Sequence, residues 1–503
     1  MILTLLIVLP LMGGLLAWIT GSWSRSLSRW LALLTLVVHL GIVLDLWFTI
    51  PARSGWLLEV DVPWIAAFGI SYHLGLDGLS LLLVLLTSFL GIIAVAASWE
   101  GIQERVGFFH FMLLWVLAAI IGIFLSLDLF LFYFFWEMML VPLYFLIGIW
   151  GHENRVYATI KFFLFTQASS LFMLLSILGL YFTNAGNTGV YTFDYNILIH
   201  ARLVPATAFW LSLGFLIAFI VKLPAVPFHT WLPDAHTEAP TAGSVFLAGL
   251  VLKVGAYGLL RFSIPLFPGA SQTIAPWMMA LGVIGILYGA LGAYGQTDIK
   301  RLVAYTSVSH MGFVLIGIFA WNQYALQGAI MVMLAHGIST GALFVLAGDL
   351  SDLLHTRNME QMGGLWETIP RFGGASLLFA LASLGLPGLG NFIGEFLVLL
   401  GAYQANITIA VLATLGFIVS TIYSLWLIQR VFLGPNKHSW KLPDMTARQA
   451  VILACLIVVI FWLGLYPQPV LSTAQPALET IQQYSAEQQG SFLPSQIEST
   501  NKP

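Results

Sequence analysis

The sequence predicts an all-α, polytopic membrane protein with about 14 transmembrane helices, and three observations lead to this fold class. Of the 503 residues, 59% are apolar and only 8% are charged, whereas a soluble globular chain has roughly 25% charged residues. The apolar residues gather in runs of about 20, the length that crosses a bilayer. Lysine and arginine are concentrated in alternate loops between these runs. The composition excludes a soluble enzyme, and the net charge of −3 gives no basic surface for a nucleic acid.

The apolar runs define the expected helices, and no piece of soluble-domain size separates them. Because their number is even, both ends of the chain should lie on one side of the membrane. The runs lie near 2–20, 29–50, 76–98, 108–126, 128–149, 159–183, 206–223, 241–261, 276–295, 301–320, 324–349, 372–400, 407–430 and 449–466. The first run has no basic residue before it, so we expect a membrane helix rather than a cleaved signal peptide. A polar tail follows Pro467.

The basic residues test this division into spans. Of the 19 lysines and arginines, 13 fall in loops after odd-numbered spans, and four fall in loops after even-numbered spans or in the tail. The other two, Lys222 and Lys253, lie within spans. Since cytoplasmic loops of membrane proteins are enriched in lysine and arginine, the odd loops should be cytoplasmic and both termini should be periplasmic.

Ionisable residues near the middle of spans are the candidate functional groups. A charge at this depth costs roughly 2.5–3.5 kcal/mol on the insertion scale, so each one needs a structural or functional explanation. Five different spans contain such a group, and together they suggest a row parallel to the membrane plane. These residues are Glu137, Lys253, His310, His336 and Glu395, and Lys222 joins them at the end of the seventh span.

Two spans should be broken helices. The seventh contains Pro224 and Pro227, and the twelfth contains Pro387 among glycines. Proline removes a backbone donor, and in a bilayer such breaks persist only inside protein or beside a water-filled cavity. The breaks are five spans apart, which is typical of two inverted repeats in transporters. The expected units are three N-terminal helices, a first five-helix repeat, a second five-helix repeat, and a last helix with its tail, over 1–107, 108–262, 263–432 and 433–503.

Simpler explanations exist for several of these residues. Intramembrane histidines are often only packed and hydrogen-bonded, and Glu137 with Lys222 could be a static ion pair. Lys253 has no acidic partner evident in the sequence, so burial makes a neutral, proton-accepting lysine feasible. In the loop of the seventh span, His229 and His236 could take up protons, but capping and solvating that loop is the more ordinary function.

Four strings of this sequence resemble one family over most of the chain, from about residue 60 to residue 470. They are FFWEMMLVPLYFLIGIWG (134–151), VKLPAVPFHTWLPDAHTEAPT (221–241), TDIKRLVAYTSVSHMGF (297–313) and GLPGLGNFIGEF (385–396). The strings are similar to the antiporter-like subunits of respiratory complex I, the proton-translocating NADH–quinone oxidoreductase, and to the related multisubunit sodium/proton antiporters. Within the family, one complex I subunit has glutamate at the position that matches Glu395, and its two sister subunits have lysine.

The resemblance implies a function for each matching residue. Glu137 and Lys222 would be the acid and lysine of the fifth and seventh helices, and Lys253 would be the central lysine. His310 and His336 would connect it to Glu395, from which protons leave. The resemblance also implies a bacterial inner membrane, the other membrane subunits of complex I as partners, and NADH, flavin, iron–sulfur clusters and quinone in those partners. We expect no cofactor and no metal in this chain, whose single Cys455 cannot ligate a cluster.

The sequence therefore predicts a proton-translocating subunit of a translocase, driven by redox chemistry in partner subunits. A subunit of a multisubunit sodium/proton antiporter is the alternative, and sodium-dependent proton flux without any NADH dehydrogenase would distinguish it. A passive spacer between catalytic subunits is a third hypothesis. The row of costly charges argues against a spacer.

Overall fold

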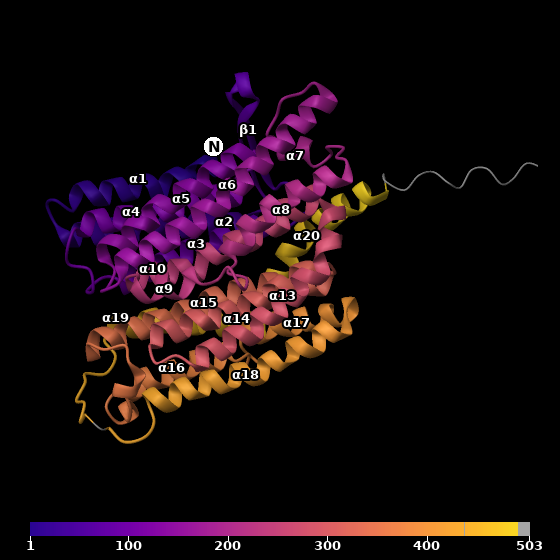
Figure 1. Ribbon diagram of the computed structural model, residues 1–503. Helices are drawn as coiled ribbons and strands as arrows, with labels where there is room; N and C mark the ends of the chain where they lie inside the picture. Colours follow the sequence, from indigo (N-terminus) through magenta and orange to yellow (C-terminus); the bar gives the residue numbers. More distant parts are fainter. Residues whose placement is uncertain (437, 491–503) are drawn as a thin grey trace, which may run out of the picture.

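The computed structural model describes residues 1–436 and 438–490, and over these ranges it is a bundle of helices that run roughly parallel to one another (Figure 1). Thirteen helical segments of the described chain are long and apolar enough to cross a membrane. They are α1 (Ile2–Thr20), α2 (Arg25–Thr49), α3 (Gly78–Ala97), α4 (Val106–Leu125), α5 (Leu129–Trp150), α6 (Arg155–Thr188), α8 (Pro205–Lys222), α10 to α12 (Thr241–Leu266), α13 (Pro268–Tyr294), α14 (Ile299–Phe319), α15 (Gln323–Leu354), α18 (Ile407–Val431) and α19 (Ala447–Leu465). The predicted fold class is confirmed.

The remaining expected span is divided between two shorter helices, as its sequence predicts. Helix α16 (Pro370–Ser383) ends before the segment that contains Pro387, and α17 (Gly390–Ala405) begins after it. Gly385 and Gly388 have φ of +80° and +95° in this connection, a conformation that glycine adopts without strain. The seventh span is also broken, because α8 ends at Lys222 and α9 (Trp231–Glu238) continues after an irregular connection.

The eighth span is a helix whose hydrogen-bonding pattern changes twice. Two π-helical turns, η2 (Leu247–Val251) and η3 (Leu259–Ser263), alternate with α10 (Thr241–Phe246), α11 (Leu252–Gly258) and α12 (Ile264–Leu266). From Ala242 to Leu266 every residue of this span is buried. Helices α14 and α15 pack against it from the second half of the chain. Groups on the eighth span can therefore meet groups from helices far away in the sequence.

One end of the bundle, which we call the hairpin face, has structure that the sequence analysis did not predict. Residues 51–75 form an antiparallel hairpin of β1 (Leu58–Ile65) and β2 (Ile70–Leu76) joined by η1 (Ala66–Phe68), and the short helix α7 (Tyr195–Leu198) lies nearby. The imidazole of His73 ties the hairpin to the 190s segment, with ring nitrogens 2.5 Å from Asp194 and 2.8 Å from Glu59. Burial alone lowers the pKa of His73, but these hydrogen bonds raise it to about 9.

The same face contains a helix where we expected a polar tail. Helix α20 (Gln468–Gly490) packs against α3, α12, α13 and α15, and it buries Val470, Leu478 and Ile481. Hydropathy does not predict this helix, because its composition is polar and only one stripe of its surface is apolar. The polar tail expected after Pro467 is therefore helical up to Gly490, and 491–503 lie outside the described residues.

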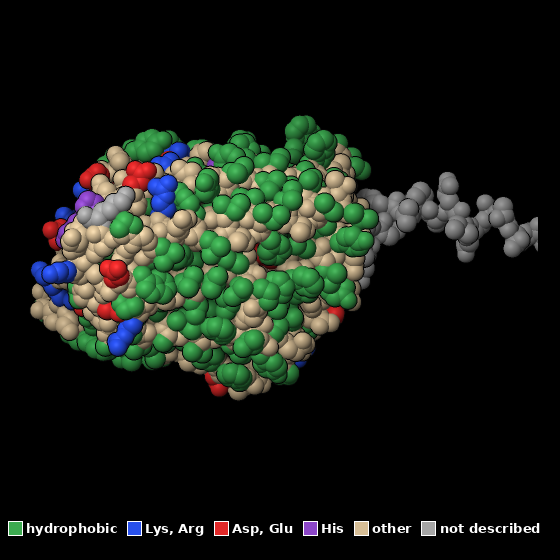
Figure 2. Space-filling view, turned by 90° about the horizontal axis from the view of Figure 1, so that it is seen from below, with side chains coloured by type: hydrophobic (Ala, Val, Ile, Leu, Met, Phe, Trp, Pro, Cys, Tyr) green, Lys and Arg blue, Asp and Glu red, His purple; other side chains and the backbone are tan. Residues whose placement is uncertain are grey.

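The opposite end, which we call the basic face, has most of the charged side chains (Figure 2). It consists of the connections that follow α1, α3, α5, α9, α13, α15 and α18, together with the short helices η4 (Met359–Gln361) and η5 (Leu365–Glu367). Ion pairs hold α9 there, since Asp234 lies 2.6 Å from Lys161 and 3.3 Å from Arg301. Two basic residues that enter the 13-to-4 division, Lys437 and Lys502, lie outside the described residues.

Candidate functional site

Lys253 is in direct contact with His336 at the centre of the bundle. The Lys253 Nζ lies 2.7 Å from His336 Nδ1 and donates a hydrogen bond of 2.5 Å to the Ala248 carbonyl in the π turn η2. Both side chains are fully buried. A π turn leaves carbonyl groups without their usual helical partner, and such turns occur frequently at functional sites. The turn therefore orients the lysine amine toward the histidine of α15.

His336 leads to His310 and then to Glu395. The two imidazole rings are 5.4 Å apart between centroids, and His310 Nδ1 lies 2.8 Å from Glu395 Oε1. The other nitrogen of His310 lies 3.1 Å from Ser383 Oγ, at the end of α16. Lys253, His336, His310 and Glu395 thus form a continuous row, which we call the central row. It joins α11, α15, α14 and α17.

Polar groups without protein partners lie beside the central row. Among the described residues, no hydrogen-bond partner is found for His336 Nε2, Ser339 Oγ, Thr340 Oγ1 or the side-chain amide of Asn391. All are buried. Buried polar atoms are normally satisfied by protein or by ordered water. These atoms can bind water molecules that bridge the rings, as proton transfer between side chains requires.

The expected ion pair between Glu137 and Lys222 is not formed. In the described chain, neither Glu137 Oε1 nor Lys222 Nζ has a hydrogen-bond partner, and no ion pair of up to 4.0 Å joins them. Instead, Lys222 Nζ lies 5.1 Å from the ring centroid of Trp136 and 5.8 Å from that of Phe162. Aromatic faces attract a cation, so the residue adjacent to Glu137 provides the contact that Glu137 was expected to make.

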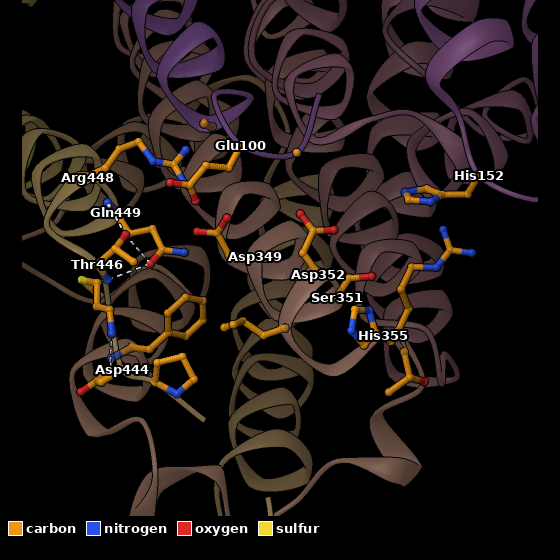
Figure 3. A pocket seen from close by; sticks show the side chains of 18 of the residues that line it. Glu100, His152, Asp349, Ser351, Asp352, His355, Asp444, Thr446, Arg448 and Gln449 are labelled. Carbon is orange, nitrogen blue, oxygen red and sulfur yellow. Dashed lines mark hydrogen bonds and ion pairs between the residues drawn. The ribbon is translucent and has the colours of Figure 1, made fainter. Parts of the chain in front are cut away.

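A hollow of about 860 Å³ opens on the basic face, and the sequence analysis missed it (Figure 3). Six carboxylates line it, and they come from five separate connections and helix ends. They are Glu100, Glu153, Asp298, Asp349, Asp352 and Asp444. Nothing in the sequence pattern marks such a hollow, because its residues meet only through the packing of distant loops.

From this hollow, titratable groups extend inward to the central row. His152 lines the hollow, and its Nε2 lies 3.4 Å from the buried amine of Lys300. Burial, then the charges of Lys300 and Arg357, lower the pKa of His152 to about 4, so this imidazole is neutral at pH 7. His236 of α9 lies within electrostatic reach of both Lys300 and Lys253. In the sequence, Lys300 is one of the 13 basic residues in the loops after odd-numbered spans, and no pattern marks it as part of a site.

The expected capping function of His229 and His236 is wrong. Both side chains are buried, and within the described ranges neither ring makes a hydrogen bond through either nitrogen. His236 stacks on Phe344 with centroids 4.6 Å apart, and His229 packs against Tyr288. A buried imidazole with two free nitrogens can accept and release a proton. The burial and the two unpaired nitrogens therefore favour the proton-uptake alternative for His236.

Comparison with known proteins identifies relatives of this arrangement. Residues 126–422 match the family model described as NADH:quinone oxidoreductase/Mrp antiporter, TM. The chain is 53% identical over 498 residues to NADH-quinone oxidoreductase subunit M of Pseudomonas aeruginosa, and the match covers 96% of this chain and 98% of that one. It is 50% identical over 499 residues to the subunit M of Escherichia coli, with the same coverage.

Solved structures of two membrane complexes have the same fold. A chain of respiratory complex I from Thermus thermophilus superimposes with a TM-score of 0.88 at 30% identity, over 96% of this chain and 99% of that one. A chain of the Mrp complex from Dietzia superimposes with a TM-score of 0.83 at 23% identity, over 96% and 99%. The second likeness is one of fold alone.

Proposed function

The chain belongs to the NADH:quinone oxidoreductase/Mrp antiporter family, and we propose that it is the proton-translocating M subunit of a bacterial NADH–quinone oxidoreductase. The observation that carries this proposal is the unbroken row of contacts from Lys253 through His336 and His310 to Glu395. The energy for translocation comes from NADH oxidation and quinone reduction in partner subunits, which hold the flavin and the iron–sulfur clusters. The chain itself would act only on protons.

The proposed direction of transport follows from the two faces. Because basic residues gather in the loops after odd-numbered spans, the basic face is cytoplasmic and the hairpin face is periplasmic. Both termini are then periplasmic, and the bilayer is the bacterial inner membrane. Protons enter at the carboxylate-lined hollow, and they leave toward the periplasm beyond Glu395.

In the proposed path, protons pass from the hollow to His152 and Lys300, then by way of His236 to Lys253. Lys253 holds the proton while the lysine has no access to either face of the membrane. Transfer through His336 and His310 loads Glu395. The side chains exchange protons through hydrogen bonds and bridging water.

Glu137 of α5 and Lys222 at the end of α8 form the proposed switch. In the structure their ion pair is open, with Lys222 over Trp136. When Glu137 attracts Lys222, the positive charge is held away from Lys253. When the pair is open, the Lys222 charge is free to favour loss of the Lys253 proton. At about 4 Å and an effective dielectric near 20, two unit charges interact by about 4 kcal/mol, which is enough to drive such a change.

We also propose that the chain contains two five-helix repeats. The first five-helix repeat, 108–262, contains the switch and Lys253, and the second, 263–432, contains the histidines and Glu395. The broken helices α8–α9 and α16–α17 occupy equivalent places in these two units. This correspondence supports an inverted repeat. Sister antiporter-like subunits would flank the chain in the assembled complex.

The test is the Lys253→Met variant in the assembled complex, reconstituted in liposomes. Methionine fills a similar volume but cannot bind a proton, so we expect protons pumped per NADH to fall, with turnover reduced at least about tenfold if pumping and redox chemistry are tightly coupled. The control is Lys441→Met, an exposed lysine of the α18–α19 connection, which should behave as wild type. A fully assembled Lys253→Met complex that pumps as many protons per NADH as wild type would overturn the proposal.

A further inference from the structure

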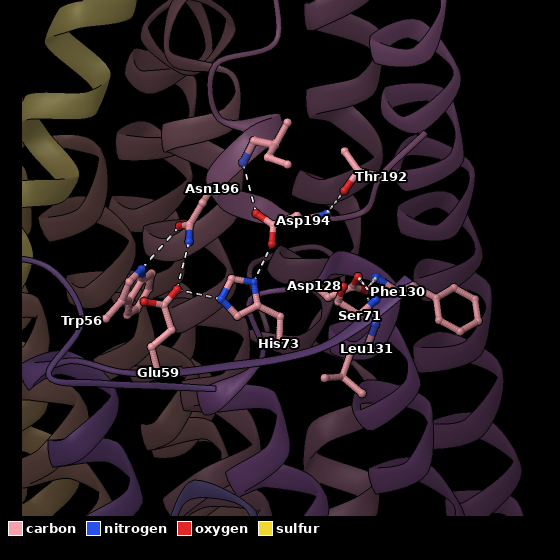
Figure 4. A network of polar contacts seen from close by, with 11 residues as sticks. Trp56, Glu59, Ser71, His73, Asp128, Phe130, Leu131, Thr192, Asp194 and Asn196 are labelled. Atoms are coloured by element: carbon pink, nitrogen blue, oxygen red, sulfur yellow. Dashed lines mark hydrogen bonds and ion pairs between the residues drawn. The ribbon is translucent and has the colours of Figure 1, made fainter. Parts of the chain in front are cut away.

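A cluster of one histidine and three carboxylates lies on the hairpin face, and Figure 4 shows two of these carboxylates, Glu59 and Asp194, hydrogen-bonded to His73. Asp61 is on β1, His73 is on β2, and Asp194 precedes α7. Glu59 lies two residues before Asp61 on the same strand. No step of proton transfer in the central row uses these residues, so the cluster needs its own explanation.

Three residues of the cluster point one ligand atom each toward a common position. The ligand atoms of Asp61, His73 and Asp194 all lie within 4.8 Å of one another. The first two are a directly opposed cross-strand pair of the hairpin, so their spacing is determined by the sheet. Asp194 is fixed because its carboxylate accepts a hydrogen bond from the Ile197 amide, 3.2 Å away. Rigid backbone thus places all three.

The hydrogen bonds of His73 distinguish its two nitrogens. Nε2 lies 2.8 Å from Glu59, and Nδ1 lies 2.5 Å from Asp194. A histidine that binds a metal typically donates its other ring N–H to a carboxylate, which orients the ring and makes it a better ligand. Glu59 occupies that position here. Nδ1 is therefore the nitrogen that faces the common position.

Asp61 has no evident structural function. Within the described chain its carboxylate takes part in no ion pair, since those of the hairpin join His73 only to Glu59 and Asp194. Asp61 is exposed, while His73 is buried and Asp194 is half-buried. The exposed side leaves access for an ion and its remaining water ligands. The carboxylate of Asp61 is thus free to bind a cation beside His73.

We propose that Asp61, His73 and Asp194 bind one divalent transition-metal ion, of which zinc is the best match, with Glu59 orienting the histidine. Imidazole and carboxylate ligands suit zinc, whereas calcium and magnesium prefer oxygen ligands alone. Zinc binds nitrogen and oxygen at about 2.0–2.2 Å, which places tetrahedral ligand atoms about 3.3 Å apart. The contact of 2.5 Å between His73 Nδ1 and Asp194 Oδ2 then has to lengthen by less than about 1 Å. Water completes the coordination on the exposed side.

A bound ion would cross-link the hairpin to the 190s segment. The hairpin face is already joined by backbone hydrogen bonds, such as Leu127 N to the His73 carbonyl at 2.9 Å and Tyr195 N to the Leu127 carbonyl at 2.8 Å. Binding would release to solvent the proton that His73 Nδ1 shares with Asp194, and the ion would then join β1, β2 and the residue that precedes α7. We expect it to stabilise this face of the protein.

The test is zinc binding by the assembled complex, purified and stripped of metal with a chelator. Zn²⁺ alone is titrated in, and bound metal is counted by mass spectrometry after equilibrium dialysis. The informative variant is Asp61→Asn, which leaves both hydrogen bonds of His73 in place. We expect it to lose one zinc equivalent or to bind it at least about tenfold more weakly. His73→Gln should lose the same equivalent.

Two comparisons make the result decisive. Asp45→Asn removes another exposed aspartate, near the end of α2, and it should bind zinc as wild type does. If Asp61→Asn binds the same number of zinc ions with the same affinity as wild type, the proposal is wrong. Because Asp61 takes no part in the hydrogen bonds that hold the hairpin, this outcome can be read even if His73→Gln fails to assemble.

Discussion

Glu137 differs from the other candidate residues because it is only half-buried. The other candidates are at most 2% exposed, and they are Lys222, Lys253, His310, His336 and Glu395. An acid that is partly exposed in this chain, with an unsatisfied Oε1, can respond to a charge outside the chain as well as to Lys222. This position suits a group that receives a signal from a neighbouring subunit and passes it to the lysines.

The switch predicts that charge at residue 137 matters more than shape. Glu137→Gln keeps the size of the side chain but cannot attract Lys222, so NADH–quinone turnover and proton pumping should both fall at least about tenfold. Glu137→Asp keeps the charge and should retain much of both activities. The measurement is proton uptake and NADH oxidation in reconstituted liposomes. Equal activity of the Gln variant and wild type, in complexes of equal subunit content, would rule out the switch.

The candidate residues could be found from the sequence, but their contacts could not. Hydropathy alone marks Lys253 and His336, because an ionisable group in an apolar run has few explanations. Which of them touch depends on how distant helices pack. The pairing of Glu137 with Lys222 was expected but is not formed, and the expected connection through the histidines did not specify that His336, rather than His310, contacts Lys253. Lys300 was missed for a related reason, since a lysine next to a loop looks like an orienting charge.

At the scale of elements, the break between α16 and α17 positions Glu395. Gly385 and Gly388 both have positive φ, so each would be strained by a side chain. Their surroundings differ. A Cβ at Gly385 would lie 2.9 Å from Glu395 Oε2 and 2.8 Å from Phe417, whereas a Cβ at Gly388 would meet nothing closer than 4.0 Å. Gly385 therefore allows the backbone to approach the Glu395 carboxylate closely. Gly388 only allows the chain to turn.

This difference predicts different outcomes for two matched substitutions. Gly388→Ala should cost about 1–2 kcal/mol of backbone strain and leave pumping unchanged. Gly385→Ala has the same strain, and it should also displace Glu395 from His310 and lower the protons pumped per NADH. Thermal stability and pumping, measured on both variants, separate the two effects. Identical pumping in the two variants would show that close approach at Gly385 has no functional consequence.

The elements that the sequence analysis missed are those that do not follow the membrane pattern. The broken spans were predictable because proline and glycine interrupt apolar runs in an obvious way. The residues of β1, LEVDVPWI, alternate apolar and polar side chains over their first half, but a short strand is a weak signal beside fourteen helices. Helix α20 is polar over most of its surface, and only its packing against α3 and α15 shows which stripe is buried.

At the scale of the whole molecule, the two faces of the bundle differ in charge and in structure. Basic and acidic side chains gather at one end in Figure 2, and the wide band between the ends is apolar. The other end is covered by the hairpin and α20. A bundle with a charged, hollowed end and a covered end is asymmetric across the membrane, and directional transport depends on how this asymmetry is oriented.

The proposed orientation predicts which face a reagent can reach from outside. In a Cys455→Ser background, which removes the exposed thiol on α19, Ser22→Cys places a thiol on the basic face and Ser54→Cys places one on the hairpin face. Both serines are exposed, and both changes are nearly isosteric. A charged, membrane-impermeant maleimide added to intact spheroplasts should label Ser54→Cys and not Ser22→Cys, because it cannot cross the hydrocarbon core. Permeabilised membranes should label both. Labelling of Ser22→Cys in intact spheroplasts would reverse the orientation, and with it the direction of transport from the hollow to Glu395.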